Sequence, residues 1–178
     1  MSEERMMDVR EQLKLRIDRE LRFFMDDVIE DIQRLAKKFQ IEKQDEKSPF
    51  KNVLSVSTEP STSLEALKTF IRYQIGRQGS SKIWKQKQGN KYFAVELVES
   101  IEQLHQTATD LLDSIQKSYK SGQEEDDLQA FLEDRNNYQQ VVKDLHMTLA
   151  QLYLGHLARE HTALVREFQN SSKKKARR

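Results

Sequence analysis

The sequence predicts an all-α fold, an elongated bundle of four principal helices with a basic loop between the second and the third. Apolar residues recur at intervals of three and four over long stretches of the 178-residue chain, which is the spacing of one helix face. Only five glycines and two prolines interrupt the sequence. Hydrophobic residues make up 37% and charged residues 33%, a balance that helical bundles tolerate because each helix buries one stripe and exposes the rest.

The first predicted helix covers residues 4–39 and contains no glycine or proline. Its apolar stripe consists of Val9, Leu13, Ile17, Leu21, Phe24, Val28, Ile32, Leu35 and Phe39. At 1.5 Å per residue this helix would be roughly 54 Å long. Residues 41–62 contain both prolines and little periodicity, so we expect a long loop there. The apolar run Phe50–Val56 inside it suggests a segment that packs in extended form.

The second predicted helix starts near Ser63, because Thr62 and Glu65 have the spacing of a capping box. Gly76 or Gly79 is the expected stop. The stretch Gly76–Lys91, here called the basic loop, follows, and a short helical turn around Ile83 and Trp84 is allowed within it. The third helix is expected over 92–119 and the fourth over 128–168, with a break near 136–137.

The acidic run Glu124–Asp127 is expected at the start of the fourth helix, where a helix N-terminus favours negative charge. These elements together predict a single helical domain over residues 1–170. The last segment, SSKKKARR at 171–178, has no large apolar residue and is predicted to be a flexible basic tail.

The chain has no cysteine, which excludes disulfides and thiolate chemistry and suits a reducing compartment. No apolar run approaches the roughly 18 residues that a membrane span needs, and the charged N-terminus does not resemble a signal peptide. We therefore expect a cytoplasmic protein without a membrane partner.

Catalytic and metal-binding patterns are weak. Glu102 and His105 form one Glu-x-x-His pair, but a ferritin-like di-iron site needs a second such pair. His156 and Glu160 have a hemerythrin-like spacing, but such a site needs more histidines than this chain offers. No phosphate-binding loop, dinucleotide fingerprint or nucleophile elbow occurs. We expect no catalytic residues, no metal and no cofactor, and hence no enzyme.

The net charge of +1 conceals a strong segregation of charge. Residues 66–95 carry seven basic groups and no acid, whereas residues 96–170 carry six basic and 14 acidic groups. Basic side chains neutralise phosphates, and aromatic rings offer faces on which unpaired bases stack. The candidate nucleic-acid-binding residues are Arg72, Tyr73, Arg77, Lys82, Trp84, Lys85, Lys87 and Lys91.

Two simpler interpretations stay open for these residues. Tyr73, Phe93 and Trp84 could be core anchors, and the cations could pair with the acidic third and fourth helices. An acidic protein or a membrane surface is a further alternative to nucleic acid as the partner of the basic segment.

The run Leu67–Arg77 (LKTFIRYQIGR), Trp84 in the basic loop and the helix from Phe93 resemble the all-helical small subunits of class 1 CRISPR effector complexes. The resemblance is strongest to type III systems and to the related helical C-terminal regions of their large subunits. It covers about residues 64–119. The long first helix and the basic tail depart from the family pattern, and the chain is longer than most members.

This resemblance implies a non-catalytic subunit of a ribonucleoprotein, working in antiviral defence beside other protein subunits. Its basic face would support RNA or single-stranded DNA. From their positions in the sequence, the residues that would contact the nucleic-acid backbone are Arg72, Arg77, Lys82, Lys85 and Lys87. The rival hypothesis is a helical adaptor or scaffold whose long first helix pairs with a partner protein or self-associates through coiled-coil contacts.

Overall fold

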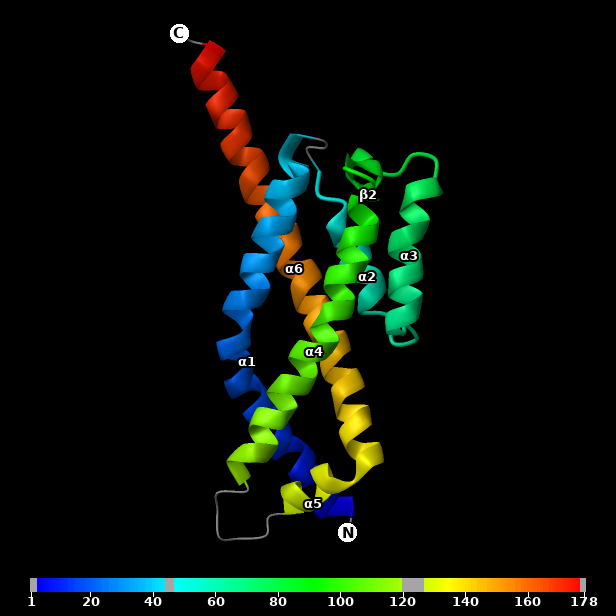
Figure 1. Cartoon of the computed structure of the whole chain (residues 1–178), viewed down its shortest axis with the longest axis vertical. Helices are drawn as coiled ribbons and strands as arrows, with labels where there is room; N and C mark the ends of the chain where they lie inside the picture. Colours follow the sequence, from blue (N-terminus) through cyan, green and yellow to red (C-terminus); the bar gives the residue numbers. More distant parts are fainter. Residues whose placement is uncertain (1–2, 44–46, 120–126, 177–178) are drawn as a thin grey trace. The chain divides into compact units, whose positions relative to one another are not determined.

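The computed structural model describes residues 3–43, 47–119 and 127–176, and most of these are helical. The α-helices in these ranges are α1 (Glu3–Phe39), α2 (Phe50–Ser57), α3 (Leu64–Gly76), α4 (Phe93–Tyr119), α5 (Asp127–Glu133) and α6 (Arg135–Ala176) (Figure 1). Two 3-10 turns, η1 (Ile41–Lys43) and η2 (Lys82–Lys85), and a two-stranded hairpin of β1 (Lys87–Gln88) and β2 (Lys91–Tyr92) complete the described chain. The prediction of an all-α protein is confirmed.

Helix α1 agrees closely with the first predicted helix. Val28, Ile32, Leu35 and Phe39 of the predicted stripe are all buried. The helix ends where Gln40 adopts a positive φ of 47°, the left-handed conformation that terminates many helices. The three-and-four spacing of apolar residues was therefore sufficient to locate this element.

Residues 1–27 and 103–149 form one compact unit. Parts of α1, α4 and α6 and the short α5 build its described core, which includes Val9, Leu13, Leu104, Leu111, Ile115, Leu128, Phe131, Leu145 and Leu149. Polar contacts also join its helices. Ser114 donates a hydrogen bond to Glu20 at 3.3 Å, and the hydroxyl of Tyr138 donates one to Asp113.

Residues 28–102 and 150–178 form a second compact unit. Its core includes Ile32, Phe39, Phe50, Leu67, Ile71, Ile83, Trp84, Phe93, Leu97, Ile101, Tyr153, Leu154 and Leu157. Helices α1, α4 and α6 each contribute residues to both units. The single domain predicted over residues 1–170 stays a prediction.

The predicted long loop over 41–62 contains helical structure. The run from Phe50 forms α2, so the prediction of an extended segment is wrong. Phe50, Val53 and Ser57 are buried, and their spacing of three and four is that of a helix face. A run this short fits either conformation, and here packing selects the helix. Residues 44–46 of the loop lie outside the described part of the chain.

Two predicted helix boundaries are displaced by a few residues. The N-cap of α3 is Ser63, whose hydroxyl accepts from the amide of Ala66 at 3.2 Å, and not Thr62. The break before α6 falls at Asp134, whose carboxylate accepts from the amides of Asn136 and Asn137 at 2.9 and 3.0 Å. Side chains that accept from exposed helix amides therefore fix both boundaries.

The ends of the fourth predicted helix also differ from the sequence prediction. Asp127 begins α5, whereas 124–126 lie outside the described residues. Helix α6 continues to Ala176, so the tail predicted to be flexible from Ser171 is helical up to that residue. Lysine and alanine favour helix formation, and cations are stabilising near a helix C-terminus. Residues 177–178 lie outside the described part.

Tyr153 joins α6 to α1 in the core of the second unit. Its side chain is 1% exposed, and its hydroxyl donates to Asp31 at 2.8 Å. Burial raises the pKa of Tyr153 far above its usual range, and the charge of Asp31 adds to this effect. The phenol therefore stays protonated and remains a donor at neutral pH.

We predict that Tyr153→Phe lowers the free energy of unfolding by about 1–2 kcal/mol, because the hydrogen bond to a charged carboxylate is lost without a change in packing. Urea unfolding followed by circular dichroism measures this loss. Tyr92→Phe, at the half-exposed end of the hairpin, is the matched control and should change stability by less than about 0.5 kcal/mol. Equal stability of Tyr153→Phe and the parent would contradict the role given to this bond.

Candidate nucleic-acid interface

The basic loop is anchored by Ile83 and Trp84 of η2, which are both buried. The Trp84 ring lies edge-to-face with Phe50 at a centroid distance of 5.4 Å and tilted against Phe93 at 5.8 Å. Phe50 and Phe93 are 5.7 Å apart, and Phe39 packs edge-to-face on Phe93 at 5.3 Å. Phe39, Phe50, Trp84 and Phe93 are here called the aromatic cluster. It attaches the loop to α1, α2 and α4.

The assignment of Trp84 as a base-stacking residue is wrong. Its side chain is 2% exposed, and its neighbours in the aromatic cluster occupy the space around its ring. An unpaired base needs an accessible ring face, which Trp84 does not offer. The alternative interpretation, that Trp84 is a core anchor, describes the structure.

The turn η2 directs two lysines to the surface. Its N-cap is Ser81, whose hydroxyl accepts from the amide of Ile83 at 3.3 Å. Because a 3-10 helix repeats every three residues, Lys82 and Lys85 share one side of the turn. Both are exposed. The ammonium of Lys85 donates to the carbonyl oxygen of Arg77 at 3.0 Å, which ties the turn to the end of α3.

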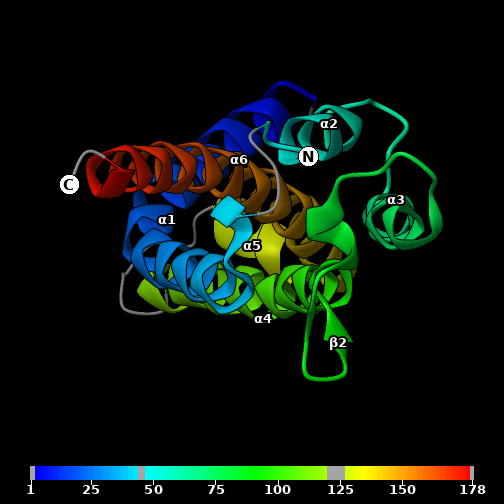
Figure 2. The ribbon, with the colours of Figure 1, turned by 90° about the horizontal axis from the view of Figure 1, so that it is seen from above.

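The hairpin of β1 and β2 follows the turn and was not predicted from the sequence. Lys87 pairs with Tyr92 and Gln88 with Lys91, which leaves Gly89 and Asn90 as a two-residue connection. Gly89 has a φ of 60°, the positive value that a tight hairpin turn requires at this position. Figure 2 shows the hairpin standing out from the neighbouring helices of this unit. The Gly-Asn pair was the sequence signal for it.

Two of the predicted contact residues are paired with carboxylates of α4. Arg72 lies 3.8 Å from Glu102, and Lys91 lies 2.7 Å from Glu99. The hydrogen bond from Lys91 to Glu99, assisted by the charge of Glu99, raises the pKa of Lys91. For these two residues the structure favours the interpretation that the basic segment is neutralised within the chain.

Lys68 shows the same neutralisation more strongly. Its side chain is 10% exposed and pairs with Glu65 of α3 and, at 3.0 Å, with Glu102 of α4. The hydrogen bond to Glu65 raises the pKa of Lys68 and burial opposes this, while Glu102 raises it further. Lys68 therefore braces α3 against α4.

The remaining predicted residues stay accessible. Arg77, Lys82, Lys85 and Lys87 are exposed around the basic loop. Lys87 lies 4.5 Å from the centroid of the Tyr92 ring, so this interaction, like that of Lys85 with a carbonyl oxygen, involves no negative charge. Tyr73, on α3, is 59% exposed and offers an aromatic face at the surface. Besides Lys91, which is paired with Glu99, the structure thus presents four cations on one anchored loop.

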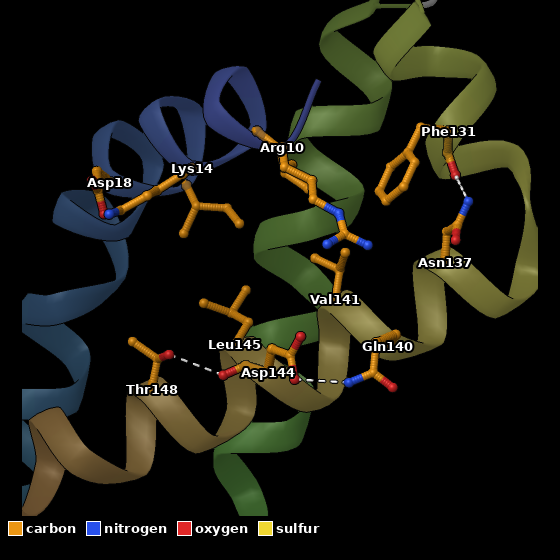
Figure 3. A pocket seen from close by; sticks show the side chains of 12 residues that line it. Arg10, Lys14, Asp18, Phe131, Asn137, Gln140, Val141, Asp144, Leu145 and Thr148 are labelled. Carbon is orange, nitrogen blue, oxygen red and sulfur yellow. Dashed lines mark hydrogen bonds between the residues drawn. The ribbon is translucent and has the colours of Figure 1, made fainter. Parts of the chain in front are cut away.

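The first unit contains a cavity of about 650 Å³ with a different character. Figure 3 shows Arg10 and Lys14 of α1 on one side and Gln140 and Asp144 of α6 on the other. Its lining includes the apolar side chains of Leu13, Ile17, Phe131, Val141 and Leu145. Because both signs of charge line this cavity, it suits a polyanion less well than the basic loop does.

In the residues that the structure describes, no group of three or more histidine, aspartate or glutamate side chains is placed to hold a metal ion. Over the same ranges, none of the helices combines the length and the apolar character that crossing a membrane requires.

Comparison of the chain with protein-family models, with curated proteins and with solved structures gives no match.

We predict that Trp84→Ala costs about 3–5 kcal/mol of stability, because it leaves a cavity among the rings that hold the basic loop. Chemical denaturation followed by circular dichroism measures the loss, and Trp84→Phe, which keeps an aromatic ring, should cost markedly less. In the parent, fluorescence of this single tryptophan should be shielded from a soluble quencher. A quencher-accessible Trp84 and a stability loss below about 1 kcal/mol would contradict the core assignment.

Proposed function

We propose that this protein is a non-catalytic nucleic-acid-binding protein that contacts the phosphate backbone of RNA or single-stranded DNA through its basic loop. The observation that carries the proposal is the display of Arg77, Lys82, Lys85 and Lys87 at the surface of a loop anchored by buried aromatic rings. Because the loop backbone is anchored, less conformational freedom is lost when a polyanion binds than a mobile loop would lose.

Binding of this kind depends on charge and is largely independent of base sequence. Each lysine or arginine that meets a phosphate releases condensed counterions, so affinity falls as salt rises. Tyr73, exposed on α3, is the aromatic residue available for stacking on an unpaired base, the role that the buried Trp84 cannot fill. The expected ligand is therefore a single strand, with RNA favoured by the resemblance to ribonucleoprotein subunits.

The assembly that the resemblance implies belongs to the same proposal. The chain would act in the cytoplasm as a helical subunit of a CRISPR effector-like complex, as an elongated bundle of four principal helices beside other proteins. Exposed apolar side chains on α1, namely Met7, Leu15 and Phe23, support contacts with a protein partner. Each is more than half exposed, at 67, 70 and 75% respectively.

The same three side chains favour a second candidate function, a helical adaptor that acts through protein–protein or coiled-coil contacts. In that case α1 makes the functional contacts, and the cations of the basic loop bind no nucleic acid. Self-association or partner binding that is insensitive to salt would support the adaptor. Salt-sensitive retention of an oligonucleotide supports the nucleic-acid-binding protein.

We predict that the triple variant Lys82→Ala/Lys85→Ala/Lys87→Ala binds single strands more weakly than the parent does. The loss of affinity should be similar for strands of unrelated sequence. The slope of log affinity against log salt should fall by about two to three units, since each phosphate contact contributes about 0.7–0.9. Fluorescence anisotropy at several salt concentrations measures both quantities.

The matched control is Lys37→Ala/Lys43→Ala/Lys47→Ala, which removes the same charge from exposed residues near the end of α1. This control should keep the parental slope to within about one unit. Equal affinity and equal slope for the loop variant and the parent would contradict the assignment of the basic loop and leave the adaptor as the better account.

A further inference from the structure

A second basic surface lies between α2 and α6, away from the segment that the sequence singles out. Here a groove of about 370 Å³ is lined by Lys51, Ala158, Arg159, Thr162, Ala163 and Arg166. Its three charged lining residues are all basic, and all three are exposed. The other lining residues are small, which leaves room between the cations.

The packing of α2 on α6 creates this groove. The Phe50 ring lies edge-to-face with the His161 ring at 5.7 Å, and Gln151 donates to the carbonyl oxygen of Ser57 at 2.7 Å. Residue numbers rise along α2 while their partners' numbers fall along α6, so the two helices run antiparallel. Lys51, next to Phe50, thereby comes to the side of α6 that carries Arg159 and Arg166.

The basic surface extends along α6 beyond the groove. Arg159, Arg166 and Lys173 recur every seven residues, and seven residues of an α-helix turn through nearly two full turns. The three cations therefore follow one another on nearly the same face at intervals of about 10.5 Å. Lys173 is exposed like the two arginines. A line of evenly spaced cations matches a linear polyanion.

Two acids of α6 lie next to this line of cations. Glu160 follows Arg159 and Glu167 follows Arg166 in the sequence, and each acid is about 100° further around the helix than its arginine. Glu160 lines a separate cavity together with Lys37 and Lys43. The cations of the groove and those of this mixed-charge cavity thus occupy different sides of α6.

The lining of the groove indicates the class of partner. Protein interfaces depend on large apolar or aromatic anchors, and the groove has none among its lining residues. A nucleic-acid backbone needs cations and close approach, which the arginines and the small side chains provide. The planar guanidinium of arginine also pairs with phosphate through two hydrogen bonds.

We infer that this α2–α6 groove, with the line of cations that continues along α6, is a second phosphate-binding surface for single-stranded nucleic acid. The inference rests on the proposed function, because it assigns a further contact surface to the same ligand. Two separate basic surfaces on one chain increase the total number of phosphates that the protein can neutralise.

The test compares the full-length parent with Arg159→Ala/Arg166→Ala, using oligouridylate as the probe and fluorescence anisotropy at several salt concentrations. The salt slope should fall by about 1.4 units, since two contacts to a single strand are lost. Arg159→Lys/Arg166→Lys keeps both charges and should keep most of the slope. Lys37→Ala/Lys43→Ala removes the same charge from the mixed-charge cavity and should keep the parental slope. Thermal unfolding confirms that each variant is folded.

An unchanged slope for Arg159→Ala/Arg166→Ala, while the basic-loop variant loses affinity, would overturn this inference and leave the proposed function intact. No binding of oligouridylate by the parent would overturn the proposed function, and the inference with it. Polyglutamate serves as a second probe, for an acidic protein. If Arg159→Ala/Arg166→Ala loses binding to polyglutamate but binds oligouridylate like the parent, the groove belongs to an acidic protein partner and the inference is overturned.

Discussion

The burial of Trp84 against Phe50 and Phe93 is the interaction on which the account of this protein depends. It places the residues of a polar, glycine-containing loop in one conformation, because the ring is fixed by side chains from α2 and α4. Burial of an aromatic side chain contributes a few kcal/mol toward holding the loop in place. The same turn carries Lys82 and Lys85 on one side of its 3-10 helix.

Five of the cations in and beside the loop fall into two groups. Lys68, Arg72 and Lys91 pair with carboxylates on α3 or α4, whereas Lys85 and Lys87 interact with a carbonyl oxygen and a ring. The first group stabilises the packing of α3 and the hairpin on α4, although exposed pairs such as Arg72–Glu102 contribute little. The second group keeps its charge available to solvent. The acid-free segment of the sequence therefore contains cations that pair within the chain and cations that do not contact a carboxylate in the interactions described above.

Much of the fold follows from the sequence, and the exceptions have physical causes. The helices around Ile32, Leu67 and Leu97 follow from apolar spacing, because one face of each is buried. The run from Phe50 was ambiguous, since eight residues fit a strand or a helix and tertiary packing decides. Sequence alone also could not place Trp84, because an aromatic residue between lysines fits a binding loop or a core. The groove at Arg159 needed the structure, since its cations come from two helices distant in sequence.

The most direct test of the central claim is the salt dependence of binding by the unmodified chain. Two single-stranded oligonucleotides of unrelated sequence are titrated at several salt concentrations, and log affinity is plotted against log salt. Contact of the nucleic-acid backbone through Arg77, Lys82, Lys85 and Lys87 predicts similar affinities for both strands. It also predicts a negative slope of about three, at about 0.7 per phosphate contact. Affinity that does not change with salt, or the absence of binding at low salt, would contradict the account.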